Sequence, residues 1–315
     1  MNPLTAIYGA VSRTRNEFYD RGVLSARRLQ GPVVSIGNIA AGGSGKTPFV
    51  IALGEMLKRR GVSFDVLSRG YGRKTKGVAL VDPDGAAVDF GDEPLLIARR
   101  LEVSVVIGED RYAAGRFAEE NFGPRLHLLD DGFQHRGLAR DFDIVLVNAT
   151  DKQDRLFPMG RLREPLSALA RADAIVLTND VPVEGLPLTH QKVWRVQRDI
   201  VAPQVEEPCL AFCGIARPGY FFAQLRATGI NVAATRSFRD HHSYTKSDLR
   251  ALLSARKKAG ATCFVTTEKD AINLDSYLDE LTPVHVVPVY MQIEDANAVA
   301  KTVWAAIAAR NSAPA

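Results

Sequence analysis

A glycine-rich turn within SIGNIAAGGSGKTPFVIALGEML, residues 35–57, joins an apolar strand pattern to an apolar-periodic helix pattern. Three glycines in such a turn allow backbone N–H groups to surround a polyphosphate, and the helix directs its positive end at the same anion. The lysine then reaches the β- and γ-phosphates, and the threonine hydroxyl ligates Mg²⁺. The turn is therefore predicted to bind a nucleoside triphosphate through Gly42, Gly43, Ser44, Gly45, Lys46 and Thr47.

One position departs from the strict P-loop pattern, which has a glycine where this chain has Ala40. The strand before the turn and the helix after it both fit. An ordinary glycine-rich connection between a strand and a helix is the alternative interpretation.

A pair of acids follows a second apolar run in LHLLDDGFQH, residues 126–135. P-loop enzymes hold Mg²⁺ with an acid at the end of a buried strand, and buried carboxylates are costly unless they bind metal or accept hydrogen bonds. Asp130 and Asp131 are therefore predicted metal ligands, and which of the two binds the ion stays open. The alternative is a turn, which the sequence D-D-G commonly begins.

The composition is that of a soluble globular protein long enough for two domains: 315 residues, 46% hydrophobic and 24% charged. No run approaches the roughly 18 apolar residues of a membrane-spanning helix, and no secretory signal is recognisable. The three cysteines fit neither a disulfide framework nor a zinc site, which favours a cytosolic protein. A net charge of +4 gives no reason to expect a nucleic-acid partner, and no motif indicates an obligate protein partner.

Positive charge is concentrated in residues 1–30, which contain five arginines, one glutamate and one aspartate and therefore have a net charge of +3. Leu4, Ile7, Tyr8 and Val11 follow the spacing of one helical face. A basic amphipathic helix of this kind suits an anionic membrane surface. The open alternative is a helix that docks on its own domain.

Short apolar strand patterns alternate with helical patterns from residue 33 to residue 179. This alternation predicts an α/β fold of the P-loop NTPase type, with a mostly parallel sheet flanked by helices. Proline and glutamate accumulate around 180–208, where we place an interdomain linker. The predicted domains are therefore a P-loop kinase domain at 31–200 and a smaller C-terminal α/β domain at 205–315.

Eight strings occur in series along residues 37–274: GNIAAGGSGKTP, SRGYGRK, GDEPLLIAR, IGEDRYAAG, LDDGFQHRGLARD, LREPLSALARAD, FRDHHSYT and TTEKDAINL. Together they make the chain similar to the tetraacyldisaccharide 4'-kinase family of lipid A assembly. The resemblance spans roughly residues 1–290, without a missing block. It implies Mg²⁺- and ATP-dependent phosphorylation of the 4'-hydroxyl of a tetraacyldisaccharide 1-phosphate, which gives lipid IVA, at the cytoplasmic face of the bacterial inner membrane. The lipid disaccharide and the anionic membrane surface are then the expected partners.

The resemblance also implies an acceptor-side pair. A hydroxyl acceptor needs a group that orients it and accepts its proton. Asp92, in GDEP, matches the catalytic base of the family, and His241 matches its partner, although His242 is one residue away. A helix cap for Asp92 and a surface loop for the histidine are the alternatives. Because the pair would come from two domains, its assembly would depend on domain closure.

Further site residues follow from the same match. Arg163 is expected to neutralise charge on the transferring phosphoryl group, and Glu164 to join the Mg²⁺ ligands; a solvated ion pair is the alternative for both. Gln134 is expected to hold either a water or an oxygen of the nucleotide. Arg69 and Tyr71 follow a strand end, where acceptor contacts are expected. Lys269 and Asp270, in TEKD, are predicted to contact the base of the nucleotide or, alternatively, to belong to a helix cap.

Two other classes of protein share part of this pattern. A P-loop metallochaperone or partitioning-type NTPase also uses G-G-x-G-K-T, but that class usually has a lysine where this chain has Ala41. A nucleotide-gated membrane adaptor without enzymatic activity would have no use for an acceptor base such as Asp92.

Overall fold

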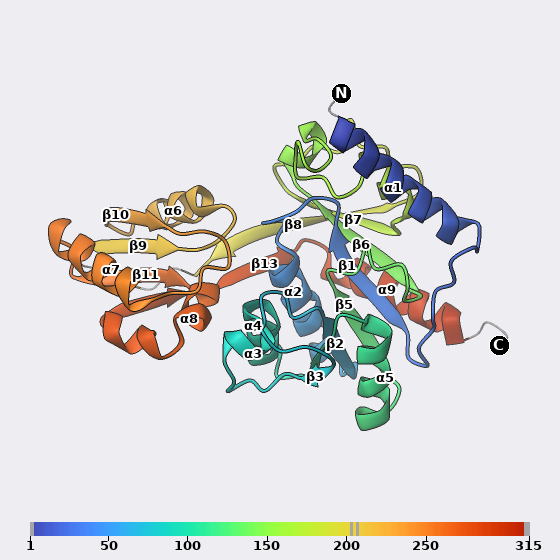
Figure 1. The fold of residues 1–315 in the computed structure, drawn as a ribbon, viewed down its shortest axis with the longest axis horizontal. Coiled ribbons are helices and arrows are strands. Elements are labelled where there is room, and N and C mark those ends of the chain that lie inside the picture. The colour runs from blue at the N-terminus through green and yellow to red at the C-terminus, as the bar shows by residue number, and fades with distance from the viewer. Residues whose placement is uncertain (1–2, 202–203, 206–207, 312–315) are drawn as a thin grey trace.

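The computed structural model describes residues 3–201, 204–205 and 208–311. The first two residues of the predicted N-terminal segment and the last four of the predicted C-terminal domain therefore lie outside the described part. Within it, the chain forms a large sheet and a small sheet, set side by side and each covered by helices (Figure 1).

The large sheet is built mainly from parallel strands, in the order β13-β8-β7-β6-β1-β5-β2-β4-β3. Only its two outermost strands within the described residues, β13 and β3, run antiparallel to their neighbours. The strands are β1 (Val33–Asn38), β2 (Phe64–Ser68), β3 (Ala79–Leu80), β4 (Val105–Ile107), β5 (Leu126–Asp130), β6 (Phe142–Val147), β7 (Ala174–Thr178), β8 (Lys192–Ile200) and β13 (Val289–Ile293).

Helices cover both faces of this sheet because its central strands are apolar on both sides. Val34 and Ile36 of β1 pack against one set of helices, whereas Val33 of the same strand packs on the opposite face. The first set is α2 (Lys46–Arg59), α4 (Asp92–Leu101) and α9 (Ala296–Asn311), and the opposite face carries α5 (Arg111–Phe122). Shorter segments complete this part of the chain: α3 (Ala87–Phe90), η1 (Ala149–Gln153) and η2 (Leu166–Arg171).

The small sheet is fully parallel, in the order β10-β9-β11-β12. Its strands are β9 (Cys209–Cys213), β10 (Val232–Ser237), β11 (Cys263–Thr267) and β12 (Val284–Val287). Phe221 and Leu225 of α6 (Pro218–Ala227) pack on one face. The other face packs against α7 (Lys246–Lys258), α8 (Glu268–Leu274) and η3 (Asp275–Leu281).

The predicted fold class is confirmed, but the C-terminal domain boundary is wrong. After β12 the chain returns to the large sheet, where Val289 pairs with Ile200 and Ile293 with Val196. Helix α9 then buries Val299, Val303 and Ile307 in the core of the large domain. The small domain is therefore an insertion that ends near residue 287. The predicted linker also contains a strand, since β8 occupies residues 192–200.

Helix α1 (Pro3–Asp20) lies on the surface of the large domain (Figure 1). Tyr8 Oη donates to the Arg163 carbonyl at 3.0 Å, and Asn16 Nδ2 donates to Glu164 Oε2 at 2.6 Å. None of the helices formed by the described residues has the length and hydropathy needed to cross a membrane.

Candidate active site

The glycine-rich turn joins β1 to α2 as the sequence predicts. Gly42, Gly43 and Gly45 have φ angles of 76°, 49° and 83°, a left-handed region that side-chain-bearing residues rarely adopt. Helix α2 begins at Lys46 directly after the turn, so its first N–H groups point into the same space. The backbone therefore has the form of an anion-binding loop.

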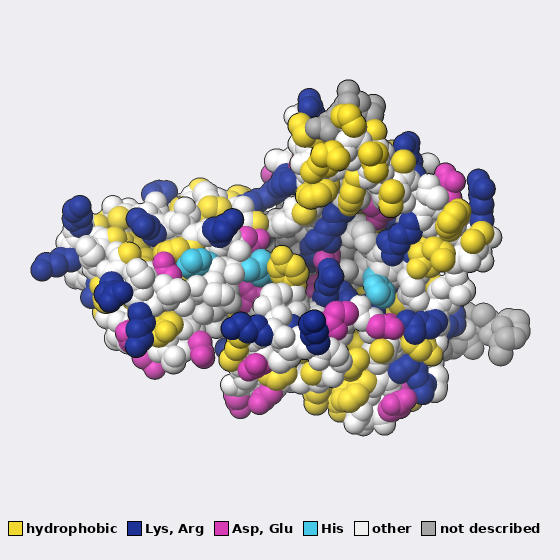
Figure 2. Space-filling model, viewed as in Figure 1, with side chains coloured by type: hydrophobic (Ala, Val, Ile, Leu, Met, Phe, Trp, Pro, Cys, Tyr) yellow, Lys and Arg dark blue, Asp and Glu magenta, His cyan; other side chains and the backbone are white. Residues whose placement is uncertain are grey.

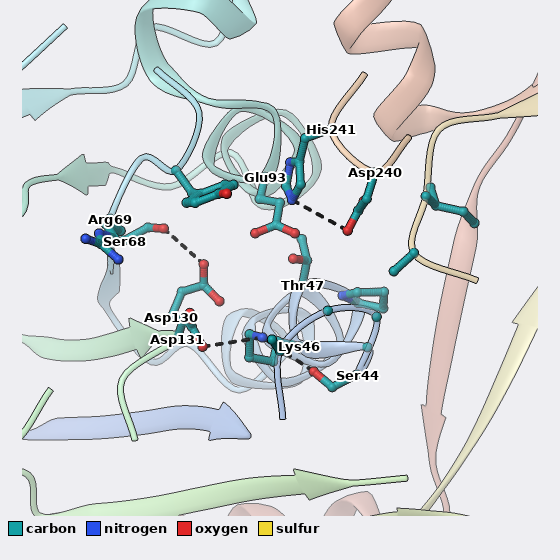
Figure 3. Close-up of a pocket in the computed structure, with 18 of the residues that line it drawn as sticks. Ser44, Lys46, Thr47, Ser68, Arg69, Glu93, Asp130, Asp131, Asp240 and His241 are labelled. Carbon is teal, nitrogen blue, oxygen red and sulfur yellow. Dashed lines mark hydrogen bonds and ion pairs between the residues drawn. The ribbon is translucent and has the colours of Figure 1, made fainter. Parts of the chain in front are cut away.

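Lys46 lies in the centre of this loop (Figure 3). Its Nζ is 3.3 Å from Asp131 Oδ1, 3.2 Å from Asn38 Oδ1 and 3.5 Å from Ser44 Oγ. These oxygens occupy the kind of position that phosphate oxygens take on a P-loop lysine. Asn38, the last residue of β1, is an addition to the predicted site.

The two adjacent aspartates have different surroundings. Asp130 ends β5 and accepts a hydrogen bond from Ser68 Oγ at 3.0 Å through Oδ2, whereas its buried Oδ1 has no hydrogen-bond partner among the described residues. Burial and the nearby charges of Glu93 and Asp131 raise the pKa of Asp130 to about 7. A buried carboxylate oxygen without a donor is the arrangement that a bound cation satisfies.

Asp131 is instead held by cations. Its carboxylate lies 2.9 Å from Arg163 Nη1 as well as next to Lys46. Burial acts to raise the pKa of Asp131, but these two charges outweigh it and lower the pKa to about 2. The backbone of Asp131 has a φ of 50°, a strained conformation of the kind found at functional sites. Of the pair, Asp130 is therefore the better placed to bind Mg²⁺.

Mg²⁺ typically takes one or two carboxylates together with phosphate oxygens and water. The described residues contain no group of three or more His, Cys, Asp or Glu side chains arranged to hold a metal by themselves. Thr47, in the first turn of α2, faces the same cleft as Asp130, so the donor set fits an ion that shares its ligands with a nucleotide.

Glu164, another predicted ligand, is already satisfied by protein groups. Its carboxylate accepts from Asn16 at 2.6 Å and from Gln134 Nε2 at 3.0 Å, and it pairs with Arg171 at 2.9 Å. Metal binding by Glu164 stays a prediction that requires one of these bonds to open. Gln134 Oε1 also accepts from Arg163 Nη1 at 3.4 Å, so the predicted Arg163, Glu164 and Gln134 form one connected network beside the acid pair.

Asp92 and His241 come from the two domains and contact each other. His241 Nδ1 lies 2.9 Å from Asp92 Oδ2, and Asn273 Nδ2 donates to the same carboxylate oxygen at 2.9 Å. The neighbouring His242 instead lies 3.2 Å from Asp248 and stacks on Phe238. The structure thus selects His241 over His242 as the partner of Asp92.

Burial and the contact between Asp92 and His241 shift the pKa of each residue in opposite directions. Burial acts to raise the pKa of Asp92, but the hydrogen bond with His241 and the charge of Lys269 lower it overall. Burial acts to lower the pKa of His241, but the bond with Asp92 raises it overall. The φ of His241 is 56°, so its backbone is strained as well.

Lys269 contacts the Asp92–His241 pair and the acids around it. Its Nζ lies 3.2 Å from His241 Nε2, 3.4 Å from Glu93 Oε1 and 3.3 Å from Asp240 Oδ1. The surrounding carboxylates outweigh the effect of burial and raise the pKa of Lys269. These contacts engage its ammonium group, and the contact of Lys269 with the base of the nucleotide stays a prediction.

Asp270 has no surface with which to contact a nucleotide. Its side chain is fully buried and accepts from Tyr244 Oη at 2.8 Å, from Thr267 Oγ1 at 2.6 Å and from the Gly214 N–H at 2.6 Å. Thr267 accepts from the Asp270 N–H at the start of α8. The helix-cap alternative describes this segment, and the predicted nucleotide contact of Asp270 is wrong.

One cleft of about 730 Å³ connects these groups. It contains the P-loop, the acid pair and His241, together with Arg69 and Tyr71, the predicted acceptor contacts. The Tyr71 ring lies edge-on to His241 with 5.1 Å between ring centroids. At its other end the cleft reaches Ser12 and Arg15 of helix α1.

Residues that the sequence did not reveal complete the site. Ser68 and Asn38 end strands next to the P-loop, which was the available signal for both. Asn273 and Glu93 have no such signal, because their roles arise from contacts between the two domains. Asp240 has none either, because it contacts Lys269 only through the tertiary fold of the small domain.

The comparisons with known proteins agree with this geometry. The sequence model of a family described as tetraacyldisaccharide-1-P 4'-kinase matches residues 1–308. Proteins named tetraacyldisaccharide 4'-kinase from Koribacter versatilis and Geobacter metallireducens are 50% and 38% identical to this chain, and the alignments cover 95% and 93% of it and 96% and 93% of the relatives.

A solved structure is similar along its whole length. The crystal structure of LpxK from Aquifex aeolicus, described as a complex with ATP, has a TM-score of 0.80 and 35% sequence identity, and the match covers 97% of this chain and 98% of that one. Because the family match spans nearly the whole sequence and a relative shares half of its residues, the chain belongs to the tetraacyldisaccharide 4'-kinase family and is an ATP-dependent kinase.

Proposed function

We propose that this chain transfers the γ-phosphoryl group of ATP to the 4'-hydroxyl of a tetraacyldisaccharide 1-phosphate, in the synthesis of lipid A. The observation that supports this assignment is that the P-loop and His241, the hydrogen-bonding partner of Asp92, line one cleft. A partitioning-type NTPase or a membrane adaptor would have no need for the second of these elements.

In the transfer, the 4'-oxygen forms a bond to Pγ while the bond between Pγ and the β–γ bridging oxygen breaks. The acceptor proton passes to Asp92, which His241 and Asn273 hold in one orientation. Arg163 and Lys46 oppose the negative charge on the transferring group. Thr47 and Asp130 are the groups that would hold Mg²⁺, which when bound neutralises charge on the β- and γ-oxygens.

The pairing of Asp92 with His241 couples the reaction to the arrangement of the domains. Asp92 begins α4 of the large domain, whereas His241 follows β10 of the small one. A displacement of the small domain would separate the two side chains and leave Asp92 without its partner. We infer that the full acceptor-side site exists only when the domains are in contact, which limits transfer of the phosphoryl group to water.

A phosphotransfer assay with γ-labelled ATP and the purified disaccharide 1-phosphate tests this function. Label should appear on the lipid with the wild-type chain and should fall by at least about a hundredfold with Lys46→Ala, because charge neutralisation and positioning dominate phosphoryl transfer. Lys58→Ala, on the exposed end of the same helix, is the matched control. Hydrolysis of ATP without label on any lipid would contradict the proposal.

We further propose that the chain works at the cytoplasmic face of the inner membrane, with α1 as its contact. Leu4, Ile7 and Val11 are 62%, 61% and 64% exposed on one side of this helix. Phe157 and Met159, each 53% exposed, continue the apolar surface, and Figure 2 shows hydrophobic side chains gathered there with basic residues around them. An apolar row beside arginines suits insertion at an anionic lipid surface.

The two interpretations of the N-terminal segment are compatible under this proposal. Helix α1 docks through Tyr8 and Asn16 beside Arg163 and Glu164, while the side chains of Leu4 and Ile7 remain exposed and available to lipid. The cleft begins at the docked face, so an acyl chain held in the membrane would lie next to the entrance of the site.

A further inference from the structure

Helices α4 and α8 belong to different domains and pack against each other (Figure 1). Glu93 and Arg100 of α4 are seven residues apart, which is about two helical turns, so they lie on the same side of this helix. Lys269 contacts Glu93 near the beginning of α4, and Glu268 contacts Arg100 near its end. Two consecutive residues in the first turn of α8 therefore hold opposite ends of one face of α4.

Arg100 is the centre of the second of these contacts. Its Nη1 donates to both carboxylate oxygens of Glu268 at 2.9 Å, and its Nη2 lies 3.6 Å from Glu55 Oε1. Its guanidinium carbon lies 4.5 Å from the centroid of the Tyr290 ring. The side chains of Arg100 and Glu268 are 16% and 21% exposed, so this ion pair is largely protected from water and from screening by salt.

The elements that meet at Arg100 carry different parts of the enzyme. Helix α4 begins at Asp92, and Glu55 belongs to α2, the helix that follows the P-loop. Tyr290 belongs to β13, one of the two strands that connect the domains, and Glu268 begins α8 of the small domain. Arg100 thus joins the nucleotide-binding helix and the domain connection to the helix that reaches the acceptor side.

Helix α8 supplies two groups to the acceptor side. Lys269 Nζ lies 3.2 Å from His241 Nε2, and Asn273 Nδ2 donates to Asp92 Oδ2 at 2.9 Å. Over the described part of the chain, each of the other ion pairs between the two domains includes His241 or Lys269. The ion pair of Arg100 with Glu268 therefore fixes α8 on α4 without using either of these acceptor-side groups.

We propose that Arg100 is a positioning residue for phosphoryl transfer. Its ion pair with Glu268 holds the first turn of α8 on α4, and so keeps the α8 side chains in contact with the Asp92–His241 pair. Arg100 forms neither a hydrogen bond nor an ion pair with Asp92 or His241 in the described structure, so it acts through α8. A displacement of about 1 Å in a reactive group can slow a reaction up to a hundredfold. The inference rests on the function proposed above, in which Asp92 accepts the acceptor proton.

Steady-state transfer by the full chain, with labelled ATP and the purified disaccharide 1-phosphate, tests this role. Arg100→Gln should lower kcat about tenfold, the size expected for the loss of one charge-assisted contact. The KM for ATP should stay within about twofold, because the P-loop is unchanged. Glu268→Gln removes the same ion pair from the other side and should lower kcat to a similar degree. The double variant should be about as slow as either single variant, and Arg100→Lys should recover part of the loss.

The pH profile gives a readout that a loss of stability alone would not change. The charged groups that face His241 are Asp92, Glu93, Asp240 and Lys269. The charge of Lys269 opposes a proton on His241, and the neutral histidine is the active form. Arg100→Gln loosens Lys269, so it should move the limb of kcat/KM that depends on His241 to higher pH.

Arg99→Gln is the matched control, because it removes the same charge from the next residue of α4. Arg99 donates to the carbonyls of Pro83 and Gly85, within the large domain, so its loss should change neither kcat nor the pH limb. Thermal unfolding checks that each variant is folded.

Three results would overturn the positioning role: an unchanged kcat in Arg100→Gln, single-variant losses that multiply in the double variant, or a lower kcat with the pH limb at its wild-type position. Transfer by the wild-type chain tests the underlying function separately. If the wild-type chain put no label on the lipid, the proposed function itself would be wrong, and this inference with it.

Discussion

Lys269 Nζ lies 3.2 Å from His241 Nε2, on the side of the ring opposite Asp92. A protonated lysine can only donate hydrogen bonds, so the Nε2 of His241 must accept and its proton must be on Nδ1, facing Asp92. The lysine thereby selects the tautomer in which His241 orients the carboxylate, and an additional proton on His241 would break the contact with Lys269.

This relationship predicts the effect of Lys269 on pH dependence. The neutral form of His241 is the active one, so kcat/KM should rise with pH along a limb above the usual histidine pKa of about 6.5, since pairing with Asp92 raises the pKa of His241. The charge of Lys269 opposes that proton, so Lys269→Met should move the limb to higher pH and Lys269→Arg should leave it near the wild-type position. A limb that stays in place in Lys269→Met would contradict the tautomer assignment.

The Asp92–His241 contact also predicts how stability changes with pH. A histidine with a raised pKa stabilises the fold fully below its unfolded pKa of about 6.5, and this contribution is lost as pH rises through the folded pKa. The melting temperature of His241→Ala should therefore fall further below wild type at pH 5.5 than at pH 9. His190→Ala, an exposed histidine outside the cleft, should show no such difference. An equal deficit at both pH values would mean that His241 contributes packing only.

Removal of Asp92 should slow transfer without weakening ATP binding. Asp92→Ala is expected to lower kcat by roughly 10²–10⁴, the usual contribution of a general base, with the KM for ATP close to wild type. The double variant with His241→Ala should be about as slow as Asp92→Ala, because residues that act as a unit are not additive. Asp89→Ala, on an exposed site just before α4, is the control. If the two single-variant losses in kcat multiply in the double variant, Asp92 and His241 act independently and not as a pair.

Neutralising Asp130 and neutralising Asp131 should change the stability of the chain in opposite directions. Asp130→Asn removes a buried negative charge without a donor at Oδ1, so it should raise the free energy of unfolding by on the order of 1 kcal/mol when no metal or nucleotide is present, while increasing the Mg²⁺ concentration needed for activity. Asp131→Asn breaks contacts with Lys46 and Arg163 and should destabilise the chain. Thermal unfolding and Mg²⁺ titrations measure both effects, and the opposite ranking would assign the metal to Asp131.

Substitutions on the exposed row of α1 should separate membrane binding from catalysis. Leu4→Asn with Ile7→Asn should reduce sedimentation with anionic vesicles while leaving ATP turnover on a detergent-dispersed acceptor within about twofold, because neither residue is among those that line the cleft. Deletion of residues 1–22 is expected to lower both, since it also removes Tyr8 and Asn16. High salt should weaken vesicle binding of the wild-type chain. Unchanged sedimentation of the double variant would leave α1 as a docked helix only.

Local patterns predicted the nucleotide side of the site. The P-loop and the acid pair are each contained in about ten consecutive residues, and the strand before each one is apolar on both faces, so spacing alone places them at the same edge of a parallel sheet. The acceptor side is different. Asp92 and His241 are 149 residues apart, and only the family resemblance linked them.

The errors have a common physical origin. Val289–Ile293 has the composition of a strand, but the local sequence does not determine which sheet this strand joins. Its pairing with β8 depends on tertiary contacts. The helix cap at Thr267 was visible in TEKD, whereas the position of Lys269 against α4 depends on how two domains meet. Contacts between separately folded units leave little trace in local periodicity.

The return of the chain to the large sheet has a mechanical consequence. Ile200 and Val289 are paired residues of adjacent antiparallel strands, so the small domain is attached by a ribbon of two hydrogen-bonded strands in place of a single flexible tether. Both ends of the small domain are therefore held at one place on the large sheet, so a displacement of this domain has to bend or twist the ribbon. Such a displacement would move His241, Lys269 and the loop after β9, whose Ala216 lies next to Gly43, together relative to the P-loop.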